Sequence, residues 1–159
     1  LDRTRAELVA VAGDLLLQRI GAERGQYRSS AGKDIGVLVQ EMVPGSREFV
    51  MGMTRFPGFG PVLLFGLGGI FTEALKDTAF RSAPVSLTEA QDMIGDIRAS
   101  GLLGEFRGMP AADSESLAGI VQKLGFIAML HPEIAEMDLN PVIIAGPQPV
   151  VADALVVIG

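Results

Sequence analysis

Two β-rich runs close the chain, and they constrain its fold more than any other feature. Residues 134–144 and 150–158 are dominated by apolar and β-branched side chains, and the turn-forming sequence Ala-Gly-Pro-Gln at 145–148 separates them. The pattern predicts an antiparallel hairpin. A turn centred on Gly146 and Pro147 then fixes which residues of the two strands lie opposite each other.

Three oxygen-bearing side chains meet on one face of this predicted hairpin. The turn places Asn140 opposite Asp153, and cross-strand partners of this kind lie roughly 5 Å apart. Asp138 shares their face because side chains along a strand alternate with period two. Two carboxylates and an amide suit Mg²⁺, which completes its shell with water and phosphate. The same pattern also fits a solvent-exposed polar face, and a register slip of one residue would turn Asp153 to the other face.

Composition and charge narrow the class of protein. The 159 residues are 48% hydrophobic and 20% charged, which is typical of a folded globular domain. A net charge of -6 and a pI near 4.7 argue against a nucleic-acid-binding protein, which needs a basic face. Residues 131–159 hold four carboxylates and no Lys or Arg, and this uncompensated charge favours a bound cation.

The sequence predicts neither a secretory signal nor a membrane-spanning helix. The chain begins at Leu1 without a signal pattern, so we expect it to be a fragment of something longer. The charge-free stretch 56–72 is too short to span a bilayer and carries five glycines and two prolines. The absence of Cys suits a reducing compartment, and we expect a cytoplasmic protein.

The first third of the chain contains helix and strand patterns in succession. Apolar residues with a 3.6-residue period predict a helix over 2–20, and the polar, glycine-punctuated residues 21–33 predict a connection. Residues 37–43 and 48–54 predict two strands, which the turn at Pro44-Gly45 would join as an antiparallel pair.

The middle of the chain adds one strand and two helices. A short β-rich run predicts a strand over 61–65. A helix is predicted from about 88 to 100, with Ser86 or Thr88 as its N-cap, and a second helix over 113–130. Together these elements predict an α+β domain with an antiparallel sheet and flanking helices.

Five motifs occur in a fixed order along the chain. They are Val-Leu-Val-Gln-Glu-Met-Val-Pro-Gly from 37, Arg-Glu-Phe from 47, Phe-Gly-Pro from 59, Gly-Leu-Gly-Gly-Ile-Phe-Thr-Glu from 66 and Asp-Leu-Asn-Pro from 138. This ordered set resembles the C-terminal portion of the ATP-grasp domain of NDP-forming acyl-CoA synthetases, a family related to the beta subunit of succinyl-CoA synthetase. The resemblance implies an ATP-grasp nucleotide-binding subdomain over 35–159, with residues 1–34 completing the preceding subdomain.

The resemblance implies a site for ATP or ADP with Mg²⁺. The segment of Glu41, Met42 and Val43 would be the hinge on which adenine lies, and Glu48 would accept hydrogen bonds from the ribose hydroxyls. The family's metal-binding acid, amide and acid match the three residues that the hairpin brings together, Asp138, Asn140 and Asp153.

The glycine-rich motif would face the phosphoryl group that is transferred. By resemblance, Gly68 and Gly69 form this loop and Glu73 follows it. Three cationic residues are candidates to stabilise the developing charge of the phosphoryl group: Arg55, Lys76 and Arg81. The family usually has an acidic residue after position 55, where this chain has Phe56.

The implied activity needs parts that lie outside this chain. The family interconverts acyl-CoA, ADP and phosphate with the free acid, ATP and CoA, and it passes phosphate through a histidine in a CoA-binding partner domain. The only histidine here, His131, is predicted to cap a helix end. The family's preceding subdomain carries further nucleotide-binding lysines, so we expect this fragment alone to bind MgATP weakly. The alternative function is a ligand-sensing or structural module of a protein acetyltransferase fused to a degenerate synthetase region.

Overall fold

The structure, a computed structural model, describes residues 24–28, 34–38, 42–69 and 75–159. The chain divides into two compact units, Leu1–Met42 and Val43–Gly159, and each is described by itself. The predicted helix over 2–20 lies outside the described residues. The division that the sequence suggests at residue 34 concerns the subdomains of a longer protein, and it stays a prediction.

The first unit contains a short antiparallel hairpin. Strands β1 (Arg24–Arg28) and β2 (Asp34–Leu38) pair with each other, with Tyr27 opposite Ile35. The prediction of a connection over 21–33 is therefore wrong for β1. This segment is polar and has no strand-like apolar pattern, but its backbone pairs with β2. The predicted pairing of 37–43 with 48–54 is also wrong, because β2 pairs with β1 and the second segment has other partners.

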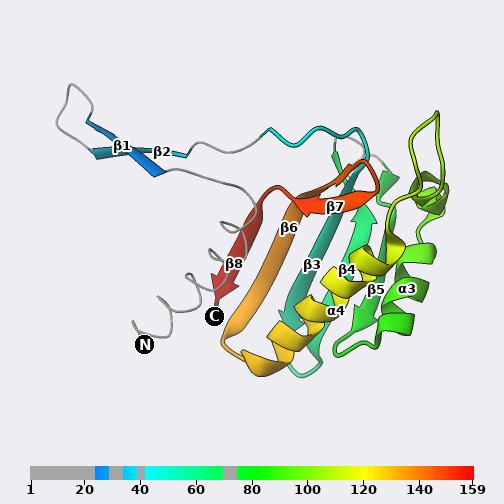
Figure 1. Ribbon diagram of the computed structural model, residues 1–159. Coiled ribbons are helices and arrows are strands. Elements are labelled where there is room, and N and C mark those ends of the chain that lie inside the picture. The colour runs from blue at the N-terminus through cyan, green and yellow to red at the C-terminus, as the bar shows by residue number, and fades with distance from the viewer. Residues whose placement is uncertain (1–23, 29–33, 39–41, 70–74) are drawn as a thin grey trace. The chain divides into compact units, whose positions relative to one another are not determined.

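The second unit is built on one antiparallel sheet. Its strands follow the order β5-β4-β3-β6-β7, and β8 pairs with β6 beside β7. Figure 1 shows the strands side by side with the helices across one face. The strands are β3 (Glu48–Phe56), β4 (Gly60–Leu67), β5 (Thr78–Ser82), β6 (Ile134–Ala145), β7 (Gln148–Val151) and β8 (Ala154–Ile158). The predicted α+β class with flanking helices is confirmed.

Helix α4 (Ser114–Leu130) begins and ends where the sequence predicts. The Asp113 side chain accepts a hydrogen bond from the Ser116 N–H at 3.0 Å and caps the first turn. The last turn ends at His131, whose N–H donates to the Ile127 carbonyl. His131 therefore lies at the C-cap, as predicted.

Helix α3 (Leu87–Gly95) begins as predicted but ends about five residues early. Its N-cap is Ser86, which forms a reciprocal capping box with Glu89. The chain then forms a 3₁₀ helix, η2 (Arg98–Leu103), instead of continuing the α-helix. The cause is Asp77, a buried carboxylate that accepts the backbone N–H groups of Arg98 and Ala99 at 2.8 and 2.7 Å. A capping residue so distant in sequence leaves no local pattern.

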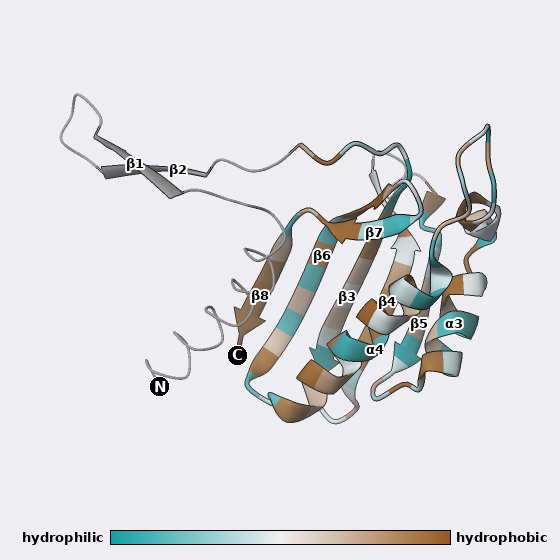
Figure 2. Ribbon diagram, viewed as in Figure 1, coloured by the Kyte–Doolittle hydropathy of each residue, from teal (hydrophilic) through white to brown (hydrophobic). Residues whose placement is uncertain are grey.

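The core lies between the sheet and the two α-helices. Phe49, Met51 and Met53 alternate along β3 and are at most 1% exposed. The Phe49 ring stacks on Phe65 of β4 with centroids 5.4 Å apart. Apolar residues of both helices are buried, among them Met93 of α3 and Leu117 of α4, and Figure 2 shows hydrophobic residues along the strands and helices of this unit. The other face of the sheet, called the far face below, therefore carries the alternate residues of β3, which are Glu48, Val50, Gly52 and Thr54.

Candidate functional site

The register of the C-terminal hairpin is the one that the sequence predicts. Val142 lies opposite Val151, and Leu139 lies opposite Ala154, so the same register holds on both sides of Asn140 and Asp153. The Asn140 N–H donates to the Asp153 carbonyl at 3.3 Å. The predicted single strand over 150–158 is two strands, β7 and β8, because residues 152 and 153 leave the regular ladder, although the Ala152 N–H still donates to the Pro141 carbonyl at 3.0 Å.

A β-bulge in β6 lies at the candidate metal site. Phe49 pairs with Val142 and Met51 pairs with Leu139, so β6 has one residue more than β3 between these two pairs. The extra residue lets both Leu139 and Val142 face the core while Asn140 stays exposed. The bulge thus sets Asn140 apart from the regular ladder, beside the gap between β7 and β8.

The carboxylates of this hairpin interact electrostatically. The pKa of Asp138 is raised, first by partial burial and then by the negative charges of Glu136 and Asp153. Asp138 and Asp153 are therefore close enough for their negative charges to repel each other. A cation between the two carboxylates would offset this repulsion, so their oxygens and the Asn140 amide oxygen fit Mg²⁺.

The number of carboxylates fits a metal that keeps other ligands. Among the residues that the structure describes, no three His, Cys, Asp or Glu side chains form a metal-binding group. The hairpin offers two carboxylates and the Asn140 amide, and Mg²⁺ is commonly held by one or two carboxylates with water and phosphate. Two carboxylates and one amide leave coordination positions for water and phosphate.

A second cluster lies at the upper end of the sheet in Figure 1, where β3 begins and β4 ends. The Gly68 N–H donates to the Glu48 carbonyl at 2.8 Å. A Cβ at Gly68 would lie 2.9 Å from the backbone of Glu48 and Phe49, so only glycine fits there. Gly69 has a φ of +69°, and a Cβ there would lie 2.9 Å from the Glu48 carboxylate. The structure therefore brings Glu48, Gly68 and Gly69 together.

These three residues line a pocket of about 450 Å³. Most of its apolar lining residues come from η2 and the segment that follows it. The remaining lining residues are Ser46, Arg47, Leu67, Leu102, Phe106 and Met109. An acid, a glycine-rich turn and an apolar wall make a pocket suited to a small organic ligand with polar groups.

The two clusters lie on one face of the sheet. Gly52 lies opposite Asp138, and Glu48 is four residues earlier on the same face of β3. At about 3.3 Å per residue, four residues of strand span about 13 Å. An extended nucleotide has comparable length from ribose to terminal phosphate.

Two of the predicted phosphoryl-stabilising cations lie elsewhere. Arg55 is near the opposite end of β3, where its guanidinium donates to the carbonyls of Ile134, Ala128 and His131 at 2.9, 2.6 and 3.2 Å. It thereby caps the C-terminus of α4. Arg81 lies on β5 opposite the core residue Leu63 and pairs with Asp96, the C-cap of α3. The structure brings neither arginine to the two glycines.

The other predicted residues lie at or beyond the edges of the described segments. Glu41 and Glu73 are outside the described residues. Lys76 is exposed, with a φ of +46°. Met42 and Val43 lie on either side of the boundary between the two units. The predicted hinge therefore coincides with the division of the chain, while contacts with adenine stay a prediction.

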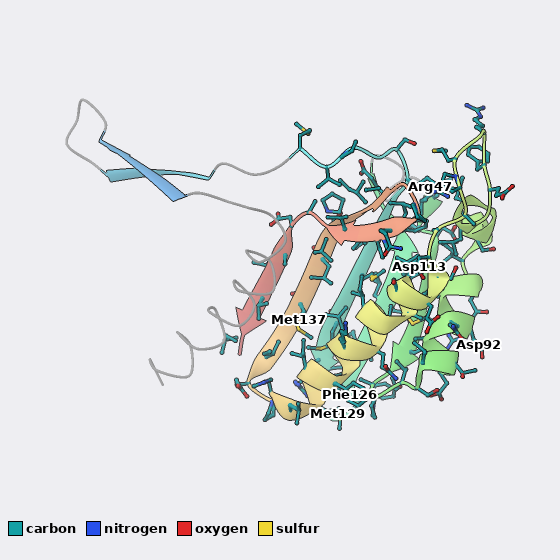
Figure 3. The ribbon with its side chains drawn as sticks, in the orientation of Figure 1. Arg47, Asp92, Asp113, Phe126, Met129 and Met137 are labelled. Atoms are coloured by element: carbon teal, nitrogen blue, oxygen red, sulfur yellow. The ribbon has the colours of Figure 1, made fainter. Side chains whose placement is uncertain are left out.

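Sequence reasoning missed the organising role of Arg47 at the upper cluster. This side chain is 5% exposed and is labelled in Figure 3. Its guanidinium donates to four backbone carbonyls, those of Leu102, Gly104, Pro110 and Gly146, at 3.0, 3.1, 2.8 and 3.3 Å. The only sequence signal was its place directly before Glu48 in the Arg-Glu-Phe motif.

No helix among the described residues is both long and apolar enough to cross a membrane.

This chain is similar in sequence to known ATP-grasp proteins. The family model of the ATP-grasp domain matches residues 5–158. The acetate–CoA ligase [ADP-forming] I of Archaeoglobus fulgidus is 42% identical over 124 residues, which are 78% of this chain and 18% of that protein. The beta subunit of the corresponding ligase of Pyrococcus furiosus is 42% identical over 123 residues, covering 77% of this chain and 53% of the subunit.

Solved structures show the same relationship. The dinucleotide-forming acetyl-coenzyme A synthetase 1 of Ca. Korarchaeum cryptofilum, in complex with coenzyme A and Mg-AMPPCP, matches with a TM-score of 0.72 and 45% identity. The match covers 77% of this chain and 57% of that chain. The apo form matches with a TM-score of 0.74 and 44% identity. This chain therefore spans about half, or less, of the length of these relatives, and it belongs to the ATP-grasp family.

Proposed function

We propose that this chain is the nucleotide- and Mg-binding part of an NDP-forming acyl-CoA synthetase. The observation that carries the proposal is the arrangement of Glu48 and of the hairpin residues Asp138, Asn140 and Asp153 along one face of the sheet. The Korarchaeum relative, 45% identical, was solved with coenzyme A and Mg-AMPPCP and with its phosphohistidine segment pointing toward the nucleotide-binding site.

Each cluster has a separate task in this proposal. Glu48 accepts hydrogen bonds from the ribose hydroxyls, and the Gly68-Gly69 turn approaches the phosphates closely because it lacks side chains. Asp138, Asn140 and Asp153 hold Mg²⁺, which when bound neutralises charge on the phosphates. The chain's contribution to phosphoryl transfer is thus positioning and charge compensation.

The phosphoryl acceptor in this proposal is a histidine outside this chain. His131 sits at the C-cap of α4 and contacts Glu133 at 3.1 Å, near Arg55 and away from the upper cluster. We infer that the CoA-binding domain with the phosphohistidine lies in the same parent protein or a partner subunit. The cytoplasmic location of the parent protein also stays a prediction.

An assay of the full-length parent protein tests the proposed function. With an organic acid, ATP, Mg²⁺ and CoA, it should form acyl-CoA and release ADP and phosphate. A protein that binds Mg-nucleotide but forms no acyl-CoA with any acid would favour the sensing module instead. A protein that binds no nucleotide would contradict both.

The sugar contact has its own prediction. In the full-length protein, Glu48→Gln should remove most of the preference for ADP over 2′-deoxy-ADP, because the neutral amide accepts sugar hydroxyls less strongly than a carboxylate. Competition binding with the two nucleotides measures the preference. Glu89→Gln, an exposed change on α3, is the matched control and should keep it. An unchanged preference in Glu48→Gln would exclude this residue as the ribose acceptor.

A further inference from the structure

The segment after η2 folds into a tight hairpin. Phe106 and Met109 exchange both backbone hydrogen bonds, at 3.2 and 2.9 Å. The two residues between them, Arg107 and Gly108, have φ values of +48° and +78°. Two consecutive positive φ angles are the mark of a type I′ turn, the tightest common connection of a β-hairpin. The segment, called the 106–109 hairpin below, therefore has a defined shape.

Arg47 fastens the base of this hairpin to the sheet. Its guanidinium donates to the carbonyls of Gly104 and Pro110, which flank the hairpin on both sides. The Ser46 hydroxyl adds a contact to the Met109 sulfur at 3.3 Å. Because Arg47 directly precedes Glu48, the strand that carries the acid also sets the position of the hairpin.

The hairpin supplies apolar residues to the pocket that Glu48 lines. Phe106 and Met109 line the same pocket as Glu48 and Gly69, and Leu102 extends their surface. Phe106 is 38% exposed, although it is a large apolar residue. The Arg107 guanidinium lies 5.4 Å from the Phe106 ring centroid and restrains the ring.

A pocket lined by both an aromatic ring and a carboxylate has a specific chemical preference. The carboxylate accepts hydrogen bonds from vicinal hydroxyls, and the ring gains free energy by covering the apolar face of a sugar or base. Among the ligands of the proposed function, ADP and ATP carry a base and a free pair of ribose hydroxyls together. Coenzyme A also carries a base, but its ribose bears a 3′-phosphate, which Glu48 would repel. Free phosphate or a carboxylic acid would leave the aromatic ring without a partner and would be repelled by Glu48.

We propose that the 106–109 hairpin is a wall of the nucleotide site and that Phe106 packs against the nucleoside of bound ADP or ATP. Phe106 is then a binding residue, and Arg47 is a positioning residue that acts through the hairpin. This inference rests on the proposed function, and it adds to it a contact from a segment more than fifty residues after Glu48.

Three variants of the full-length protein test the inference. Phe106→Ala removes the ring, Phe106→Tyr keeps it, and Phe59→Ala is the matched control. Phe59 is another exposed phenylalanine, 69% exposed, in the β3–β4 turn near Arg55. Steady-state assays of acyl-CoA formation give kcat and the KM for ATP, the acid and CoA, and anisotropy of a fluorescent ADP analogue gives the nucleotide Kd.

The expected result is selective for the nucleotide. Phe106→Ala should raise the Kd for ADP and the KM for ATP about tenfold, the effect of losing one buried aromatic contact. The KM values for acid and CoA should stay within about twofold of wild type, as a local loss of nucleotide binding requires. Phe106→Tyr should restore nucleotide affinity, and Phe59→Ala should not change it.

Two outcomes would overturn the inference. In the first, the wild-type protein is active and Phe106→Ala leaves the nucleotide Kd unchanged. This result would overturn the inference but not the proposed function. The other is a similar rise in every KM together with a lower melting temperature, which would make Phe106 a structural residue only. Loss of nucleotide binding in the wild-type protein itself would instead refute the proposed function.

Discussion

At the scale of single residues, two neighbours have complementary tasks. Arg47 is buried and directs its guanidinium to four carbonyls, while Glu48 lines the pocket beside Gly69. The order of the sequence motifs identifies Glu48 as a candidate site residue, but it does not predict the hydrogen bonds that Arg47 makes. Sequence patterns assign an isolated arginine at a strand end to the surface, because they contain no information on which carbonyls fold back onto it.

Arg47 should contribute strongly to stability. Arg47→Met keeps much of the side-chain volume but removes every donor, and it should cost about 2–3 kcal/mol because charged hydrogen bonds are lost and carbonyls become unsatisfied. Urea denaturation followed by circular dichroism measures the loss. Arg98→Met, on an exposed arginine of η2, is the matched control and should change the free energy of unfolding little. Equal stability of the two variants would show that the four hydrogen bonds contribute nothing.

At the scale of elements, sequence reasoning succeeded where the determinants are local. The C-terminal register followed from one turn, and α4 followed from its cap and period. It failed where the cause is distant. The carboxylate of Asp77 redirects the chain after α3, and the bulge in β6 depends on its register with β3. The hairpin of β1 and β2 was missed because polar residues occupy its first strand.

The N-cap of α4 should make its stability depend on pH. Hydrogen bonds to its carboxylate lower the pKa of Asp113. The largest effect comes from the Ser116 backbone N–H, the next from the Ser116 hydroxyl, and a smaller one from the Gln148 side chain. A group whose pKa is lower in the folded protein than in the unfolded chain stabilises the fold. This stabilisation is fully present above the pKa of the unfolded chain and is lost as the pH falls through the pKa of the folded protein. Asp113→Asn, which keeps an acceptor but does not titrate, should therefore lose less stability on acidification than the unmodified protein. Melting temperatures between neutral and strongly acidic pH check this, and parallel curves would contradict it.

At the scale of the whole molecule, the far face forms half of the proposed site. The family resemblance places further nucleotide contacts in the preceding subdomain, so residues 1–159 alone should bind MgADP much more weakly than the full-length parent protein. Calorimetry on both proteins measures the difference. Equal affinities would mean that the far face and its hairpins suffice, and that the preceding subdomain is dispensable for binding.

We expect the far face of the sheet to hold Mg-nucleotide through the residues that the C-terminal hairpin brings together. The most direct test is the Mg²⁺-dependent binding of AMPPCP to the full-length protein, measured by calorimetry for wild type, Asp153→Asn and Asp92→Asn. Asp92 is an exposed acid on α3, labelled in Figure 3, and provides the matched control. Asp153→Asn should weaken Mg²⁺-dependent binding at least about tenfold, because it removes one of two carboxylates from the metal. Asp92→Asn should bind like wild type. Wild-type affinity in Asp153→Asn would contradict the claim and would leave this face without the metal.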